Sequence, residues 1–127
     1  AQGACTNSAF ATQYQLPGTF APIADFTLLE TAVAVARERG IEMPVGNLVS
    51  TDNFYDVGNR TLDWGKMGVL AVEMESAALY MNAARAGKEA LCLLTISDCP
   101  LRGESLPAEE RQTGFRQMME IALETAE

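Results

Sequence analysis

The chain has 127 residues, of which 48% are hydrophobic, and it carries a formal net charge of −8 with no histidine. These values are typical of one soluble globular domain with its own core. A negative charge argues against a nucleic-acid backbone or an anionic membrane surface as the main partner, because both attract basic proteins. The sequence has no signal-peptide pattern and no apolar run near the roughly 18 to 20 residues that span a bilayer. We therefore expect neither a nucleic-acid nor a membrane partner.

The three cysteines, Cys5, Cys92 and Cys99, show neither a CxxC motif nor a zinc-finger spacing. An odd number without such spacing favours neither a disulfide framework nor a metal site. We expect a reducing, cytoplasmic setting. The first residue is Ala1 rather than methionine, and AQGACTNS opens as though a strand had been cut. We interpret the chain as a fragment.

The first third of the chain predicts a polar loop, a helix and a strand. The loop covers residues 13–22, and residues 26–39 follow with an approximate helical stripe of apolar side chains. Asp25 can cap this helix, and Gly40 suits its end. Residues 45–50 then predict a short strand that ends in a polar loop over 51–56, and a brief helical turn is expected to hold Leu62, Trp64 and Met67.

The second half predicts two buried strands and two helices. Residues 68–72 and 91–96 are uninterrupted apolar runs, as in parallel strands that are covered on both faces. An alanine-rich helix is expected between them over residues 76–86. After a loop over residues 99–106, a final helix should begin at Pro107 and reach nearly to the C-terminus.

This alternation predicts an α/β fold, with a mixed, mostly parallel sheet flanked by helices, as a single partial domain over residues 1–127. Ligands in such folds bind beyond the carboxyl ends of the strands. Three polar segments lie just past predicted strand ends and could converge on one pocket: residues 52–54, 73–75 and 97–98. The sequence contains no GxGxxG, P-loop or GxSxG motif.

Asp98 follows a buried strand, and an acid at a buried edge suits a general acid near neutral pH. The alternative is a cap for the loop that follows, and the spacing favours neither. Arg111 falls in the expected first turn of the final helix, where a cation opposes the helix dipole, so a partner such as Asp98 would explain its placement.

Glu73 and Glu75 flank Met74 where a predicted strand meets a predicted helix. If the strand continued, the two carboxylates would share a face, whereas a turn into the helix would separate them. They could be solvated charges, a pair that stabilises the helix dipole, or carboxylates that bind hydroxyls, and the residues alone favour the dipole. Met74 is ordinarily core filler, and Phe54 could stack on a flat ligand or simply be an exposed aromatic.

Several stretches, taken together and in order, resemble the C-terminal part of the bacterial-type hexameric purine nucleoside phosphorylases. They are GACTNS, PIADFTLLETAVAVARERGI, VGNLVSTDNFY, GVLAVEMESAALY, LLTISD and EERQTGFRQMMEIALE. VEMESAALY alone would indicate only the broader superfamily of nucleoside phosphorylases and nucleosidases. The acid at position 98, followed by ERQTGF, narrows the resemblance to the purine enzymes. The implied fold is an α/β sandwich around a mixed, partly barrel-like sheet.

The resemblance implies roles for eight residues. Glu75 would take the sugar hydroxyls, Met74 would pack on the sugar face, and Glu73 and Val72 would line the same pocket. Asp98 would be the general acid at N7 of the base, and Arg111 would position and activate it. Phe54 would stack on the base, and Ser97 would lie beside the acid.

The implied reaction is phosphorolysis of a purine nucleoside to free purine and pentose 1-phosphate in a homohexamer, with phosphate as co-substrate and no metal or organic cofactor. The family's phosphate-binding arginines and turn precede the matched segment, and its histidine from the neighbouring subunit has no counterpart here. We therefore expect the isolated chain to have little or no turnover, and to tend to aggregate. Two alternatives are a hydrolytic nucleosidase of the methylthioadenosine and adenosylhomocysteine type, and a non-catalytic purine-binding fragment.

Overall fold

The computed structural model describes residues 1–58, 60–113 and 115–127. Its main sheet contains three parallel strands in the order β1 (Gly3–Thr6), β2 (Asn47–Ser50) and β3 (Ala71–Glu73). Their register aligns Cys5 with Val49 and Val49 with Val72. The carboxyl ends of all three strands therefore point the same way, and the expected α/β class with a parallel sheet is confirmed.

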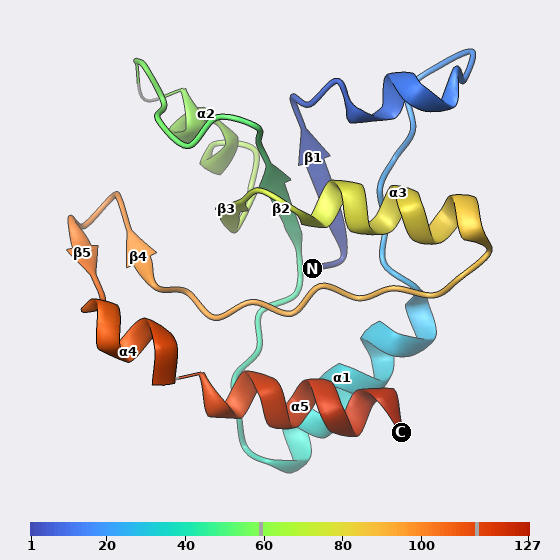
Figure 1. Cartoon of the computed structure of the whole chain (residues 1–127). Helices are drawn as coiled ribbons and strands as arrows, with labels where there is room; N and C mark the ends of the chain where they lie inside the picture. The colour runs from blue at the N-terminus through green and yellow to red at the C-terminus, as the bar shows by residue number, and fades with distance from the viewer. Residues whose placement is uncertain (59, 114) are drawn as a thin grey trace.

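The helix α3 (Ser76–Ala86) packs on β1 and crosses in front of it in Figure 1. Its buried residues Ala77, Tyr80 and Met81 form one core cluster with Ala4 of β1. The small side chains allow the close approach that the alanine-rich sequence predicts. The helix ends at Gly87, whose φ of 63° lies in the left-handed region that glycine adopts without strain.

A second core cluster joins α1 (Phe26–Glu38) to α5 (Arg116–Ala126), which lie side by side below the sheet in Figure 1. Ala32 and Ala36 pack against Ile121. Asp25 caps α1 by accepting a hydrogen bond from the Leu28 amide at 2.9 Å, as predicted. At the other end of α1, Arg39 forms ion pairs with Glu120 and Glu124 of α5.

The predicted final helix is wrong as a single element, because the structure has α4 (Ala108–Thr113) followed by α5. Gly114 belongs to the predicted helix but lies outside the described residues. Phe115, with φ of −101° and ψ of 28°, is not helical and precedes α5. The expected turn near Trp64 is the helix α2 (Thr61–Gly65). An unpredicted 3-10 helix, η1 (Phe10–Tyr14), precedes the predicted polar loop and overlaps its first two residues.

The predicted strand over residues 91–96 is also wrong. This segment is extended but forms no strand ladder within the described residues, as the long connection between α3 and β4 in Figure 1 illustrates. Its contacts are instead single hydrogen bonds, such as that from the Ala1 ammonium to the Cys92 carbonyl. Leu94 and Ile96 remain 41% and 60% exposed. The segment has the apolar sequence of a buried strand, but it pairs with no neighbouring strand among the described residues.

Two further expectations about the strands are corrected. The strand predicted over 68–72 begins only at Ala71, because residues 66–68 continue the turn after α2. It is not covered on both faces, since Val72 is 43% exposed. The predicted loop after residue 98 contains a small antiparallel hairpin of β4 (Asp98–Cys99) and β5 (Glu104–Ser105).

Among the described residues, the structure holds no helix with the length and apolar character that crossing a membrane requires.

Candidate functional site

The clearest predicted contact joins Asp98 to Arg111. Nη2 of Arg111 lies 2.6 Å from Oδ1 of Asp98 and donates a hydrogen bond to it. The Ser97 hydroxyl donates to the other oxygen, Oδ2, also at 2.6 Å. Both carboxylate oxygens of Asp98 are therefore engaged by donors. The structure thus contains the contact between Asp98 and Arg111 that the sequence predicted.

The expectation that Asp98 is buried is wrong, because 38% of its side chain is exposed. It begins β4 of the hairpin, and the preceding segment leaves the apolar core before reaching it. Arg111 is also placed differently from the prediction. It lies in the last turn of the short helix α4, where a cation is favourable to the dipole rather than opposed to it.

The hairpin holds Arg111 in place at a second point. Nε of Arg111 donates to the Leu106 carbonyl at 2.9 Å, and the Leu106 amide donates to the Ser97 carbonyl at 2.9 Å. The base of the hairpin is thus closed by a backbone bond next to the acid. Because the guanidinium bonds both the acid and the end of the hairpin, it fixes the direction of its Nη2 towards Asp98.

Glu73 forms a separate cluster at the start of α3. Its Oε2 accepts hydrogen bonds from the amides of Glu75 at 2.8 Å and Ser76 at 2.7 Å, and its Oε1 accepts one from the Ser76 hydroxyl. A carboxylate at this position satisfies free amides of the first helical turn and is favoured by the helix dipole. For Glu73, the geometry therefore fits the alternative in which its charge stabilises the helix dipole, and adds hydrogen bonds to the first turn that were not predicted.

Glu75 is separated from Glu73 because the strand ends at residue 73. With φ of −128° and ψ of −28°, Glu75 is the residue at which α3 begins, so the alternation of a strand no longer applies. Its carboxylate is exposed and makes no hydrogen bond to the described part of the chain. Met74 is 38% exposed, so it is not core filler here. Glu75 and Met74 are accordingly available to a ligand.

Burial controls the protonation of two groups near Glu73. It raises the pKa of Tyr80 to about 12, and the Tyr80 hydroxyl donates to the Ala1 carbonyl at 2.6 Å and accepts from the Cys92 amide at 3.0 Å. Burial also raises the pKa of the Cys92 thiol. The Ala1 ammonium opposes that effect, whereas the negative charges of Glu73 and Glu75 add to it. Cys92 is therefore a protonated thiol at neutral pH rather than a nucleophile.

Phe54 lies in the loop after β2 and is 77% exposed. Its ring packs edge to face on Tyr55, with the ring centroids 5.2 Å apart and the planes at 82°. Tyr55 was not singled out from the sequence, although two adjacent aromatic residues after a strand end could have drawn attention to it. The pair presents exposed aromatic surface of the kind that stacks on a flat ring.

The loops after β2 and β3 leave from neighbouring strands. Ser50 pairs with Glu73 in the register, and the Thr51 amide donates to the Glu73 carbonyl at 2.9 Å. These two of the three predicted segments therefore meet at one sheet edge, whereas Asp98 belongs to the separate hairpin. Neither of two surface cavities, a groove of 440 Å³ beside residues 93–96 and a pocket of 230 Å³ next to α3, is lined by a predicted site residue.

No cluster of three or more histidine, cysteine, aspartate or glutamate side chains that could hold a metal ion occurs within residues 1–58, 60–113 and 115–127. The three cysteines are free thiols. The chemistry that the described side chains offer is hydrogen bonding and charge: an acid held by an arginine at the hairpin, and carboxylates at the start of α3.

Comparison with known protein families shows which family the chain belongs to. The model of the phosphorylase superfamily matches residues 2–126, which is nearly the whole chain. The chain belongs to the phosphorylase superfamily. This membership agrees with the resemblance that the sequence motifs indicate.

Within the superfamily, the chain is similar to particular purine nucleoside phosphorylases. The chain is 51% identical over 107 residues to a purine nucleoside phosphorylase of the DeoD type from Geobacillus sp. (strain WCH70), covering 84% of this chain and 46% of that protein. A protein of the same name from Clostridium novyi (strain NT) is 44% identical over 128 residues, covering 100% of this chain and 55% of its own length. The chain thus spans about half the length of the curated relatives it matches.

The fold is also that of a solved structure. A purine nucleoside phosphorylase from Toxoplasma gondii, in complex with immucillin-H, superposes with a TM-score of 0.83 over 98% of this chain and 52% of that one. The identity is 22%, so this likeness shows the fold alone. It confirms the α/β architecture with a parallel sheet flanked by helices.

Proposed function

We propose that this chain forms the nucleoside-binding part of a purine nucleoside phosphorylase, as the C-terminal portion of one domain. The observation that carries the proposal is the contact between Asp98 and Arg111 in a chain that is about half identical to proteins of that name. The reaction would transfer the pentose of a purine nucleoside to phosphate, giving free purine and pentose 1-phosphate.

Asp98 would act on the leaving base. Cleavage of the glycosidic bond leaves electron density on the purine, and a proton donated towards N7 makes the base a better leaving group. In the described geometry both oxygens of Asp98 accept hydrogen bonds, so the carboxyl group is held in one orientation. To act as an acid, the carboxyl group must carry a proton in the complex with the nucleoside, with Arg111 keeping it oriented. Arg111 and Ser97 are in this proposal the groups that aim Asp98.

The residues at the end of β3 would hold the sugar. As the glycosidic bond breaks, positive charge develops on the pentose, and a nearby carboxylate stabilises that charge more in the transition state than in the ground state. Glu75 would take the sugar hydroxyls, with the exposed Met74 and Val72 against the sugar face. Glu73 would contribute by fixing the Glu75 backbone through its hydrogen bond to the Glu75 amide, and Phe54 would stack on the base.

The other half of the reaction requires groups beyond those described here. Phosphate, the proposed co-substrate, needs a cationic or amide-lined site, and we place this site in the residues of the relatives that the chain does not match. The proposal further includes assembly as a homohexamer, no metal or organic cofactor, and a cytoplasmic location, in keeping with three free thiols.

The test joins the 127-residue chain to the N-terminal residues of the Geobacillus relative that it does not match. Purine release from adenosine and inosine is then followed with and without phosphate. We expect release only with phosphate, and formation of pentose 1-phosphate. Release that is independent of phosphate would replace the proposal with a hydrolytic nucleosidase, and nucleoside binding without any release would replace it with a binding fragment.

A further inference from the structure

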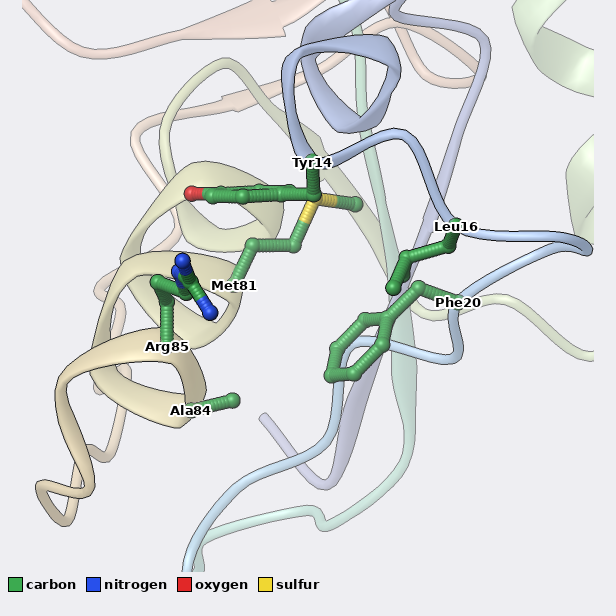
Figure 2. A pocket seen from close by; sticks show the side chains of 6 residues that line it. All are labelled: Tyr14, Leu16, Phe20, Met81, Ala84 and Arg85. Atoms are coloured by element: carbon green, nitrogen blue, oxygen red, sulfur yellow. The ribbon is translucent and has the colours of Figure 1, made fainter.

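A small pocket lies on the side of α3 that faces the N-terminal loop, away from the residues assigned above. It has a volume of 230 Å³ and is lined by six residues: Tyr14, Leu16, Phe20, Met81, Ala84 and Arg85. In Figure 2, Arg85 and Ala84 of α3 lie on one side of the pocket, and Leu16 and Phe20 of the loop lie on the other. None of the six belongs to the nucleoside site proposed above.

The walls of the pocket are held by contacts of their own. The Tyr14 hydroxyl donates to Oδ1 of Asn82 on α3 at 2.8 Å, which ties η1 to the helix. The Tyr14 ring also packs edge to face on Phe10, with centroids 6.1 Å apart. Met81 is only 3% exposed and is part of the core. Two of the six lining side chains, Tyr14 and Met81, are therefore held in place before any ligand enters, which lowers the entropic cost of binding.

Arg85 supplies the pocket's one charge. Four other arginines, at positions 39, 102, 111 and 116, form ion pairs with carboxylates, whereas the guanidinium groups of Arg85 and Arg37 have no hydrogen bond or ion pair to the described part of the chain. A cation in the last turn of a helix is favourable by itself, so its presence alone assigns nothing. Its position at the edge of an apolar pocket, in a chain of net charge −8, is what points to an anion.

We propose that this pocket binds a small organic anion built on one planar ring, of the aromatic carboxylate class. A cavity of roughly 150 Å³ is enough for benzene, so the pocket has room for a single substituted ring but not for a larger ligand. Tyr14 and Phe20 offer faces and edges against which such a ring packs. The Arg85 guanidinium matches a carboxylate with two parallel hydrogen bonds.

The test is a fluorine NMR titration of the 127-residue chain with para-fluorobenzoate. Two probes accompany it: para-fluorobenzyl alcohol, which keeps the ring without the charge, and trifluoroacetate, which keeps the charge without the ring. We expect saturable binding of the benzoate that is about tenfold tighter than that of the alcohol, and no saturation with trifluoroacetate. Equal affinity for benzoate and alcohol would overturn the proposal, as would the absence of saturable binding.

Two variants locate the effect. Arg85→Gln should remove the preference for benzoate over the alcohol, because the amide has no charge. Arg37→Gln is the matched control, since Arg37 is likewise an exposed arginine in the last turn of a helix, α1, but lies outside the pocket. It should leave the preference unchanged. Circular dichroism of both variants checks that the fold is kept, and the proposal fails if Arg85→Gln is folded and still prefers benzoate.

Discussion

Arg111 donates from Nη2 to Oδ1 of Asp98 across 2.6 Å, and the same guanidinium donates from Nε to the Leu106 carbonyl. This arrangement ties the acid to both the hairpin and α4. It is a contact between residues 13 positions apart, made by a short hairpin that returns the chain to the acid. In the proposed function, this contact orients the Asp98 carboxyl group that donates the proton.

The first prediction concerns Asp98→Asn in the joined chain described above. An amide can donate a hydrogen bond but not a proton, so cleavage of adenosine should fall about a hundredfold or more, and cleavage of inosine by less. Steady-state assays with both nucleosides measure the ratio. Asp63→Asn is the control, since it removes an exposed carboxylate of α2 that pairs with Lys66. An equal effect on both substrates would remove the assigned role of Asp98.

The second prediction concerns Ser97, whose hydroxyl donates to Oδ2 of Asp98 at 2.6 Å. Without this donor, Oδ2 of Asp98 loses the contact that orients the carboxyl group. Ser97→Ala should therefore lower kcat/KM for adenosine in the joined chain, and Ser97→Thr should restore it because the hydroxyl returns. A Ser97→Ala variant with an unchanged kcat/KM would show that Ser97 does not position the acid.

The third prediction concerns Glu73, which holds the start of α3 through the Glu75 and Ser76 amides. Glu73→Ala should lower the free energy of unfolding by about 1 kcal/mol, the usual cost of a lost helix cap. Urea denaturation of the 127-residue chain measures the change. Glu89→Ala, at an exposed glutamate beyond the end of α3, serves as the control and should be neutral. If the two variants are equally stable, Glu73 does not cap the helix.

The fourth prediction concerns Tyr80, which is 2% exposed and whose pKa is raised to about 12 from 10.0 by burial. Because the folded protein holds the neutral form, this contribution to stability is complete below pH 10 and is lost as pH rises towards 12. Unfolding measured from pH 9 to pH 12 should show that loss. Tyr80→Phe lacks the ionisable hydroxyl and should not show this loss of stability between pH 10 and pH 12.

The same variant has a cost at neutral pH. Tyr80→Phe leaves the Ala1 carbonyl and the Cys92 amide without the hydroxyl that joins them, which should destabilise the chain by about 1 to 3 kcal/mol. A variant with unchanged stability at pH 7 and an unchanged alkaline slope would contradict the role given to the hydroxyl.

Local patterns predicted much of the fold. The cap at Asp25, the helix after Glu75 and its end at Gly87 depend on neighbouring residues, and all three are in the structure. The run over residues 91–96 failed because a strand also needs a partner, and hydrophobicity carries no information about which strand is its neighbour. The hairpin at Asp98 was missed because its strands are only two residues long.

The features of the candidate site that depend on neighbouring residues were predicted better than those that depend on distant segments. Asp98 was predicted as the partner of Arg111 because Arg111 was expected in the first turn of a helix, whereas it lies in the last turn of α4. The exposure of Asp98 depends on where the hairpin leaves the core. The alternative in which Glu73 stabilises the helix dipole depends on neighbouring residues and could therefore be predicted from the sequence. Residue composition alone could not place the pocket beside Arg85, because it is formed by a loop and a helix some 70 positions apart, as the Tyr14 to Asn82 contact shows.

The most direct test of the central claim is the phosphate dependence of purine release by the joined chain. With inosine or adenosine as substrate, the account predicts that free purine and pentose 1-phosphate form together and only when phosphate is present. It also predicts that Arg111→Gln, which removes the charge facing Asp98, slows both products equally. Purine release at the same rate without phosphate, and with free pentose as the second product, would contradict the account.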